Sequence, residues 1–344
     1  MNDQQLRILH VCCTDSFAGV ERHIASLACE QAKRGHTVQI IGGDPALMTS
    51  RLSDPELDYR PARSLLHAVR AMRHLPRPTV INTHMTAAEV AAAVSVHNRG
   101  VPVVSTRHFA HRRSARRAWR PLVRVTARRI GAEIAVSKYV AGSIESGSIV
   151  VHSGVPVGPD APLARQRSPV ILMAQRLEAE KATHLGIEAF AASGLSTSGW
   201  RLQIAGGGTL HDALQRQAAD RGVGHAVDFL GQRNDVETLM RSASILIAPK
   251  PDEGYGLTVL EAMANGLPVV ASRSGGHLET VGVLPDASLF EPHNVAKAGH
   301  LLATLALDPA ARDAYGSALQ ALQRERFTVS GQAAATDAVY RSVL

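Results

Sequence analysis

The sequence predicts an α/β protein with two parallel-sheet domains, and three observations support this prediction. Short β-rich segments alternate with longer segments of helical periodicity, which is typical of βαβ units and a parallel sheet. The chain has 344 residues, a length that suits two domains of ordinary size. The segment 157–168 carries prolines and charges without periodicity, and the alternation begins again after it.

Before this segment, the alternation defines a first domain, which we place at residues 1–156. Aliphatic and β-branched residues mark the strands, and apolar positions at helical spacing mark the helices. The predicted strands are 6–11, 37–43, 79–84, 101–106 and 133–137, and the predicted helices are 20–35, 63–74, 86–97 and 114–129.

A second domain at residues 169–328 follows the linker 157–168. Its predicted strands are 170–175, 201–208, 227–231, 244–249 and 268–272, and its predicted helices are 182–193, 209–221, 235–242 and 257–265. Ligands of open parallel sheets bind outside the carboxyl ends of the strands. We therefore expect two such sheets to form a cleft, with the functional side chains directly after strands.

The composition is that of an ordinary globular protein with a cationic surface. Hydrophobic residues make up 45% of the chain and charged residues 19%, which excludes a disordered or collagen-like protein. The net charge of +7 favours an anionic partner, such as a nucleotide, a nucleic acid or a lipid surface.

The N-terminal segment and the cysteines indicate where the protein works. The start of the chain lacks the basic and apolar regions of a signal peptide, and no apolar run reaches the roughly 20 residues of a membrane helix. Cys12, Cys13 and Cys29 lie in or beside predicted buried elements, which we interpret as reduced thiols of the core. We expect a cytoplasmic protein.

Four segments that follow strands of the second domain carry residues suited to a diphosphate. Glycines let a backbone approach a phosphate closely, arginine and lysine supply positive charge, and a helix N-terminus offers unpaired N–H groups. The residues concerned are Arg176 and Lys181, Gly206 and Gly207, Gly231 and Gln232, and Gly254, Tyr255, Gly256 and Leu257.

Each of these segments also has an ordinary structural explanation when it is taken alone. Strand-to-helix turns are glycine-rich for steric reasons, and basic residues at a helix start are common on surfaces. The run Gly206–Gly208 does not match the dinucleotide pattern G-x-G-x-x-G, because His211 stands where the third glycine would be. The combination of the four segments is what predicts a diphosphate site.

Two carboxylates in the stretch EGYGLTVLEAMANGLPVVAS require a partner or a function. Glu253 opens the stretch, and Glu261 lies eight residues later inside the apolar segment that is predicted to be a helix. A buried carboxylate costs free energy unless it is paired or hydrogen-bonded. Both residues are therefore candidates for the functional site.

This stretch, extended to EGYGLTVLEAMANGLPVVASRSGGHLE, resembles the Glu-x7-Glu signature of the retaining nucleotide-sugar glycosyltransferases of family four. AQRLEAEK is similar to the Arg/Lys pair of that family, and GVERHIASLACEQAKRGHTV, STRHF, IAVSKYV and HSGVP are similar to its N-terminal segments. The resemblance extends over nearly the whole chain. It implies the GT-B fold, in which two Rossmann-like domains face each other across a cleft and a C-terminal helix, here 329–344, crosses back to the first domain.

The resemblance implies a role for each residue that matches a motif. Glu261 would accept hydrogen bonds from the ribose hydroxyls of the donor. Glu253 would contact the donor hexose and stabilise the positive charge that develops on it. Arg176 and Lys181 would neutralise the leaving diphosphate. We assign Glu253 to positioning and charge, not to covalent attack. His108 would contact the sugar from the other domain.

The resemblance also implies a hexosyltransferase that takes a UDP- or GDP-hexose and no further cofactor. No D-x-D motif occurs, and no His/Cys cluster has metal-ligand spacing, so we expect no metal requirement. The base, the sugar and the acceptor stay open, and the acceptor is a glycan, a glycolipid or a small molecule, for example in cell-envelope glycan biosynthesis. The sequence does not decide between single-face reaction and double displacement.

On the acceptor side, Gly19, Glu21 and His84 are the candidate residues. The chain departs from the family pattern here, because Ala18 stands where a second glycine is frequent. It departs again at Lys250, where the family often has a small residue. The first departure puts in question the close approach of this loop's backbone to a phosphate or the acceptor. The second departure bears on which donor is chosen.

The segment 112–129 is rich in arginine, and Arg116, Arg120, Arg124 and Arg128 recur every four residues. Three interpretations stay open for it. It is a solvated helix face, a peripheral contact with the anionic inner face of a membrane, or a contact with an acidic acceptor or a nucleic acid.

Two other functions compete with glycosyl transfer. A non-hydrolysing nucleotide-sugar epimerase shares the two-domain architecture and needs a donor but no acceptor. A basic nucleic-acid-binding protein would use the arginine-rich segment, but aromatic residues make up only 4% of the chain and no binding module is recognised, so we expect no nucleic-acid partner.

Overall fold

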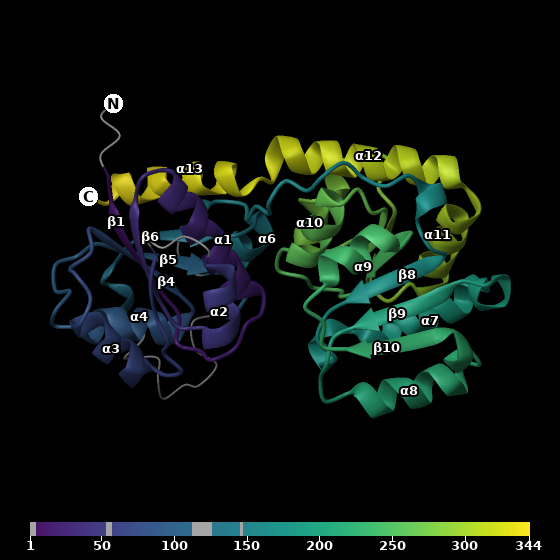
Figure 1. Cartoon of the computed structure of the whole chain (residues 1–344), viewed down its shortest axis with the longest axis horizontal. Coiled ribbons are helices and arrows are strands. Elements are labelled where there is room, and N and C mark those ends of the chain that lie inside the picture. The colour runs from purple at the N-terminus through teal and green to yellow at the C-terminus, as the bar shows by residue number, and fades with distance from the viewer. Residues whose placement is uncertain (1–4, 53–56, 112–125, 145–146) are drawn as a thin grey trace. The chain divides into compact units, whose positions relative to one another are not determined.

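The computed structural model describes residues 5–52, 57–111, 126–144 and 147–344, and the chain divides into two units. Unit 1 comprises Met1–Gly154 and Thr328–Leu344, and unit 2 comprises Val155–Phe327. The chain leaves unit 1 once and enters it again with its last helix (Figure 1). The predicted linker, 157–168, is grouped with unit 2.

Unit 1 contains a sheet whose described strands are all parallel, in the order β3-β2-β1-β4-β5-β6-β7. The strands are β1 Arg7–Val11, β2 Thr37–Ile41, β3 Asp58–Arg60, β4 Val80–His84, β5 Val103–Arg107, β6 Ile130–Ala135 and β7 Ile149–Val150. The strand order reverses between β1 and β4, which is the switch point where open parallel sheets bind ligands.

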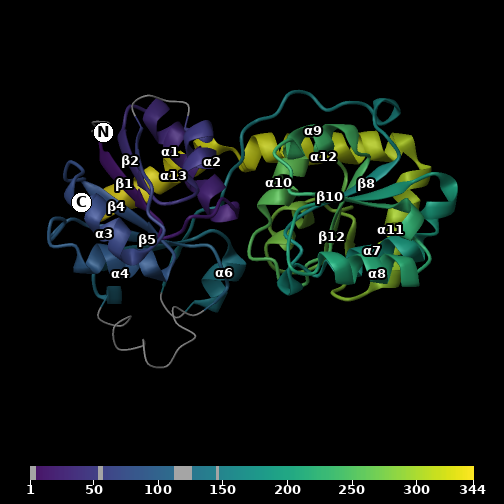
Figure 2. The ribbon, with the colours of Figure 1, turned by 60° about the horizontal axis from the view of Figure 1, so that its bottom comes forward.

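Helices cover both faces of this sheet (Figure 2). They are α1 Gly19–Lys33, α2 Pro45–Arg51, α3 Leu65–Arg73, α4 Thr86–Val94, α6 Lys138–Ser143 and α13 Val329–Ser342. Side chains alternate between the two faces along a strand. Leu9 therefore packs in one core with Met72 of α3, while Ile8 packs in another with Tyr340 of α13.

The last helix, α13, is held to unit 1 by buried polar contacts. Asn82 Nδ2 donates to the Tyr340 hydroxyl at 2.7 Å, and both side chains are inaccessible to solvent. The carboxylate of Asp337 is also fully buried, and it accepts hydrogen bonds from Gln31 Nε2 at 2.9 Å and Arg34 Nε at 3.0 Å. A buried carboxylate is stable only when it is bonded in this way, so α13 has one defined position on unit 1.

Unit 2 repeats the same plan. Its described strands are parallel in the order β10-β9-β8-β11-β12-β13, and they are β8 Val170–Ala174, β9 Arg201–Ala205, β10 Val227–Gly231, β11 Ile245–Ala248, β12 Val269–Ser272 and β13 Leu289–Phe290. Its helices are α7 Thr183–Ser193, α8 His211–Asp220, α9 Val236–Ser242, α10 Leu257–Ala264, α11 Val295–Leu307 and α12 Pro309–Arg326. The two sheets confirm the predicted α/β class.

The local differences from the predicted elements have simple causes. The edge strands β3, β7 and β13 are only two or three residues long and leave no readable alternation. Helix α2 was not predicted, although Asp44 caps it by accepting from the backbone N–H of Leu47 and Pro45 stands in its first turn. The predicted helix 114–129 falls mostly on residues 112–125, outside the described part of the chain.

Among the residues that the structure describes, no helix is both long enough and apolar enough to cross a membrane. The three cysteines are free thiols. Cys12 is buried between the sheet and α1, whereas Cys13 and Cys29 are partly exposed.

A buried arginine attaches the segment 157–168 to unit 2. Arg167 Nη1 donates to the carbonyl oxygens of Met240 and Ala243, both at 2.8 Å, at the end of α9. Its Nη2 donates to the carbonyl oxygens of Asn265 at 2.8 Å and Gly266 at 3.1 Å, at the end of α10. The guanidinium thus satisfies the last carbonyls of two helices, where a cation is favoured by the helix dipoles.

We predict that Arg167→Met lowers the free energy of unfolding of unit 2 by about 3 kcal/mol, because several buried carbonyls lose a charged donor together. Urea unfolding measures this change. Arg165→Met, an exposed position two residues earlier, is the matched control and should change stability by less than about 0.5 kcal/mol. Equal effects of the two substitutions would contradict the assignment.

Candidate functional site

The predicted diphosphate residues lie at one edge of the unit 2 sheet. Strands β10, β9, β8 and β11 are consecutive and parallel, so their carboxyl ends meet at the same edge. Arg176 and Lys181 follow β8, Gly206 and Gly207 follow β9, Gly231 ends β10 with Gln232 after it, and Glu253 to Leu257 follow β11. The structure therefore collects all four predicted segments at one place in unit 2.

Gly206 is required at this edge for steric reasons. It has φ +150°, and a Cβ on it would overlap the carbonyl oxygen of Gln175. Its N–H donates to the carbonyl of Gly231 at 2.7 Å, which joins the ends of β9 and β10. Gly207 differs, because a Cβ there would face open space. The steric explanation thus holds for Gly206 and does not apply to Gly207.

The carboxylate of Glu253 is bound to a lysine. Lys181 Nζ lies 3.1 Å from Glu253 Oε2, and both side chains are largely buried, with exposed fractions of 24% and 19%. Lys250 Nζ lies 3.8 Å from the other oxygen, Oε1, which also accepts from the N–H of Gly254 at 3.1 Å. Lys250, the residue that departs from the family pattern, is therefore a second cation beside Glu253.

The ionisation of Glu253 follows from these charges. Burial opposes ionisation, but Lys181, Lys250 and the nearby His277 outweigh it and leave the pKa of the carboxyl below its ordinary value. Glu253 is thus an anion near neutral pH. A carboxylate that is partly buried and held between two ammonium groups is the kind of group found at functional sites.

Arg176 occupies a different environment from Lys181. Its Nη2 lies 2.8 Å from Glu180 Oε1, in an ion pair whose side chains are 58% and 52% exposed. The structure places Arg176 at the same edge of the sheet but pairs it with Glu180 at the surface. Its predicted contact with a phosphate stays a prediction.

Helix α10 begins directly behind the Glu253 segment. Gly256 has φ +89°, and Leu257 is the first helical residue. Tyr255 is buried, and Glu261, half-buried, lies one turn inside the helix. The N–H groups of the first turn and the Glu261 carboxylate therefore belong to the same short helix, as the predicted donor site requires.

His277 is a site residue that the sequence analysis missed. It is buried, its Nδ1 lies 3.0 Å from the carbonyl oxygen of Ser272, and a Cβ on Gly256 would come within 3.2 Å of its ring. Burial lowers the pKa of His277 in spite of the nearby carboxylate of Glu253. The only signal in the sequence was its place within the stretch SGGHLE.

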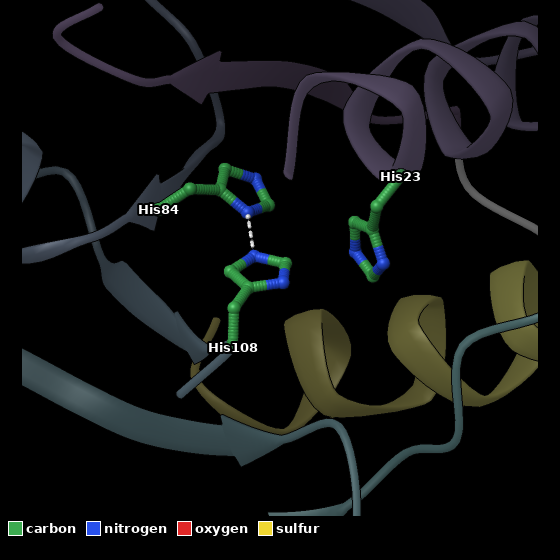
Figure 3. A group of neighbouring side chains, drawn as sticks. All are labelled: His23, His84 and His108. Carbon is green, nitrogen blue, oxygen red and sulfur yellow. Dashed lines mark hydrogen bonds between the residues drawn. The ribbon is translucent and has the colours of Figure 1, made fainter. Parts of the chain in front are cut away.

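In unit 1, four histidines lie at the carboxyl end of the sheet. His10 is near the end of β1, His84 is the last residue of β4, His108 directly follows β5, and His23 lies on α1. The rings of His84 and His108 are 5.2 Å apart between centroids, and His23 packs edge-on against His108 at 4.7 Å. Figure 3 shows the rings of His23, His84 and His108 turned toward one another. Met85, next to His84, has the unusual φ of +70°.

A chain of hydrogen bonds runs from α13 to these histidines. Asp337 Oδ1 accepts from Gln31 Nε2, and Gln31 Oε1 lies 2.8 Å from His10 Nε2. His10 Nδ1 lies 3.1 Å from His84 Nε2, and His84 Nδ1 lies 3.0 Å from His108 Nε2. His10 and His84 therefore use both ring nitrogens in this series, and His108 uses Nε2.

The donor-to-acceptor direction of these hydrogen bonds assigns the protonated nitrogen in each ring. A carboxylate only accepts, so the amide group of Gln31 faces Asp337 and its oxygen faces His10. His10 then donates from Nε2, His84 donates from Nε2 to His10 Nδ1, and His108 donates from Nε2 to His84 Nδ1. This assignment follows from the hydrogen-bond network. It leaves a lone pair on Nδ1 of His108, which is partly exposed.

Burial keeps these histidines neutral. It lowers the pKa of His10 to about 4 and, together with the charge of Arg107, that of His108 to about 3. It also lowers the pKa values of His84 and His23 well below the ordinary value, and the neighbouring rings add to this effect. Near neutral pH the cluster therefore offers lone pairs and N–H donors rather than positive charge.

The predicted acceptor residues of the first loop have local structural contacts. Gly19 is the first residue of α1. Glu21 is buried, and its Oε2 accepts from the N–H of Ala18 at 2.8 Å, so it caps the helix on which it lies. His84 belongs to the histidine chain. Their contact with an acceptor stays a prediction.

The depressed pKa values predict that unit 1 loses stability in mild acid. The pKa of His10 in the folded chain lies below that in the unfolded chain, as it does for His23, so the unfolded chain binds more protons at intermediate pH. Stability should be constant above about pH 6.5 and fall as the pH is lowered toward about 4.

Thermal unfolding between about pH 7.5 and about pH 5 measures this fall. His23→Gln should make the slope shallower by about one proton, and His74→Gln, an exposed position, should leave it unchanged. A melting temperature that stays constant over this range would contradict the neutral assignment.

The two halves of the chain match two family models. Residues 17–158 match the model described as Glycosyltransferase Family 4, and residues 159–321 match Glycosyl transferases group 1. Together the matches run without a gap from residue 17 to residue 321.

Curated relatives match parts of the chain. The lipopolysaccharide core biosynthesis mannosyltransferase LpcC of Rhizobium leguminosarum bv. viciae is 32% identical over 39% of this chain and 38% of its own length. The GDP-mannose-dependent alpha-(1-6)-phosphatidylinositol dimannoside mannosyltransferase of Mycobacterium tuberculosis is 38% identical over 31% of this chain and 28% of its own length. The matched segments thus span well under half of these two relatives.

Solved structures match the fold over nearly the whole chain. The structure of Anabaena HepE in complex with UDP and glucose has a TM-score of 0.80 at 19% identity and covers 98% of this chain and 100% of that one. Sucrose-phosphate synthase from Thermosynechococcus elongatus has a TM-score of 0.77 at 19% identity and covers 99% of each chain. Taken with the two family models, these likenesses lead to one conclusion: the chain belongs to the glycosyltransferases of the GT-B type, with a family-four domain followed by a group-one domain.

Proposed function

We propose that the chain is a retaining glycosyltransferase that moves a hexose from a UDP- or GDP-sugar to an acceptor hydroxyl. The observation that carries this proposal is the ion pair between Lys181 and Glu253, 3.1 Å long, at the carboxyl edge of the unit 2 sheet. It stands directly before the N-terminus of α10. A cation, an anion and a turn of backbone N–H groups are thereby combined in one place.

These groups suit the cleavage of a glycosyl diphosphate. Breaking the anomeric C–O bond leaves negative charge on the diphosphate and positive charge on the sugar ring. Lys181 and the first N–H groups of α10 would meet the negative charge, and the Glu253 carboxylate would meet the positive charge. Interactions that strengthen as charge develops accelerate the reaction, because they stabilise the transition state more than the bound substrate.

We further propose that the diphosphate needs no divalent metal ion. Lys181 is held in place by Glu253, and Arg176 at the same edge forms an exposed pair with Glu180. Exposed pairs of this kind contribute little free energy, so the guanidinium can turn to a phosphate at small cost. Glu261 on α10 is the proposed partner of the donor ribose.

In unit 1, His108 is the proposed contact to the sugar. The hydrogen-bond chain leaves its Nδ1 as an acceptor, which suits a hydroxyl group of a hexose. Retention of the anomeric configuration would follow if the leaving group departs and the acceptor attacks on the same face of the sugar. Glu253 would then be a positioning and charge-stabilising group. Its pairing with Lys181 supports this role over covalent attack, since a paired carboxylate is a weaker nucleophile.

The function is tested by incubating the protein with labelled UDP- and GDP-hexoses, with and without candidate acceptors. We expect transfer or slow hydrolysis with one donor, and a product with the same anomeric configuration as the donor, measured by NMR. The right donor should also raise the melting temperature most at equal concentration. Interconversion of the nucleotide sugar without an acceptor would favour an epimerase, and an inverted product would contradict retention.

Lys181→Ala should lower kcat by about 10²- to 10³-fold, as does the loss of one preorganised electrostatic donor. Steady-state kinetics with the identified donor measure this change. Lys297→Ala, at an exposed position on α11, is the matched control and should leave kcat unchanged. Turnover of Lys181→Ala close to that of the parent would remove Lys181 from the site.

The arginine-rich segment 112–129 supports a second proposal, peripheral contact with an anionic membrane. It holds Arg116, Arg120, Arg124 and Arg128 at a spacing of four residues, and each basic residue near such a surface contributes about 1 kcal/mol. Co-sedimentation with vesicles should rise with the fraction of anionic lipid and fall with salt. Binding that does not depend on anionic lipid would exclude this contact.

A further inference from the structure

We propose that unit 1 holds a binding site for a Zn²⁺-like divalent ion, formed by His23, His84 and His108. One ring nitrogen from each of these residues lies within 4.8 Å of the other two, and the group is the one set of possible metal ligands found among the described residues. The three rings come from α1, β4 and the end of β5, and they face one another (Figure 3). Imidazole nitrogen is a preferred ligand of Zn²⁺ and its neighbours in the transition series.

The spacing of the ligand atoms fits a tetrahedral ion. A Zn–N distance of about 2.0–2.1 Å places two ligand nitrogens about 3.3 Å apart. His84 Nδ1 and His108 Nε2 are 3.0 Å apart, so an ion beside this pair needs only a small adjustment. His23 packs edge-on against His108, with 4.7 Å between ring centroids, and a modest rotation of its ring would close the third position.

The hydrogen-bond network presents the required lone pairs. His84 donates its Nε2–H toward His10, which leaves the lone pair on Nδ1, the atom nearest to His108. The amide Nε2 of Gln332 lies 3.3 Å from His23 Nε2, so Nε2 carries the lone pair, and Nδ1–H donates to Ser153 Oγ at 2.9 Å. His108 becomes a ligand through Nε2 when its proton moves to Nδ1, which changes the tautomer but not the charge of the ring.

Further residues hold the ligands in place. His84 is supported by His10, and His10 by Gln31, whose amide is bound to the Asp337 carboxylate. Such an outer set, ending in a carboxylate, is what orients histidine ligands and raises their basicity. On the other side, Gln332 Oε1 accepts from the N–H of Gly154 at 2.7 Å, and its Nε2–H, 3.3 Å from His23 Nε2, donates to the lone pair that an ion would take, so ion binding replaces this contact.

The electrostatic environment permits a cation here. The positive charge of Arg107, beside His108, is offset by Glu133 at 3.5 Å. His108 is partly exposed, which gives an entry route, while His23 and His84 are buried. Three protein ligands leave a fourth position of the tetrahedron for water or for an oxygen of a bound molecule.

The site has a consequence for the proposed function, on which this part of the inference rests. His108 would be occupied by the ion and would no longer offer its lone pair to a sugar. A bound ion is therefore expected to inhibit transfer, or to replace the histidine as the group that contacts a hydroxyl. The ion would bind in unit 1, whereas the protein groups proposed to bind the diphosphate belong to unit 2.

The test is a titration of the untagged full chain, freed of metal by dialysis against a chelator. Zn²⁺ is added in competition with a chromophoric chelator, and Co²⁺ is added separately because its visible absorption reports a tetrahedral nitrogen site. We expect one tight site per chain, with an affinity at least about 10-fold lower in His23→Gln and in His108→Gln. The double variant should lose the site.

His300→Gln, an exposed position on α11, is the matched control and should bind like the parent. Circular dichroism and melting temperature verify that each variant is folded. If His108→Gln does not fold, His23→Gln alone provides the test. Equal affinity of the double variant and the parent would overturn the proposal, as would the lack of a stoichiometric site in the parent. Because these measurements use no donor sugar, failure of glycosyl transfer with every donor would leave the metal result intact.

Discussion

Parallel strands must all end at the same edge of their sheet, and both candidate sites depend on this constraint. In unit 2 it places the residues after β8, β9, β10 and β11 side by side, although they are spread over some 80 residues of sequence. In unit 1 it places His10, His84 and His108 at the ends of three adjacent strands. No single segment forms either site, and each strand contributes one or two side chains.

Much of this could be read from the sequence, because the alternation of elements is local information. The segments 170–175, 201–208 and 227–231 were predicted as strands, and the structure has strands there that end at Ala174, Ala205 and Gly231. The residues after these strands were predicted as neighbours. The pairing of Lys181 with Glu253 was not, because strand order brings two residues near each other without specifying the rotamers that join them. Arg176 illustrates this, since it shares the edge but turns to Glu180.

The histidine chain could not be predicted, because its links join residues that are far apart in sequence. Gln31 and Asp337 are separated by 306 positions, and His10 and His84 by 74. A histidine within a β-rich segment such as LRILHV is indistinguishable from an ordinary buried residue until the neighbouring strand is known. His108 was identified through a motif and His84 as an acceptor-side candidate. Their mutual contact depends on the pairing of β4 with β5, and their contacts with His23 depend on the packing of α1 on the sheet.

The position of Asp337 on the final helix has a consequence for the chemistry at the opposite end of the network. Its carboxylate fixes the orientation of the Gln31 amide. Through the hydrogen bonds of His10 and His84, this orientation determines which nitrogen of His108 bears hydrogen. Replacing this acid by asparagine would permit the reverse polarity throughout. A substitution remote from every substrate could thus convert an acceptor atom into a donor while the backbone stayed the same.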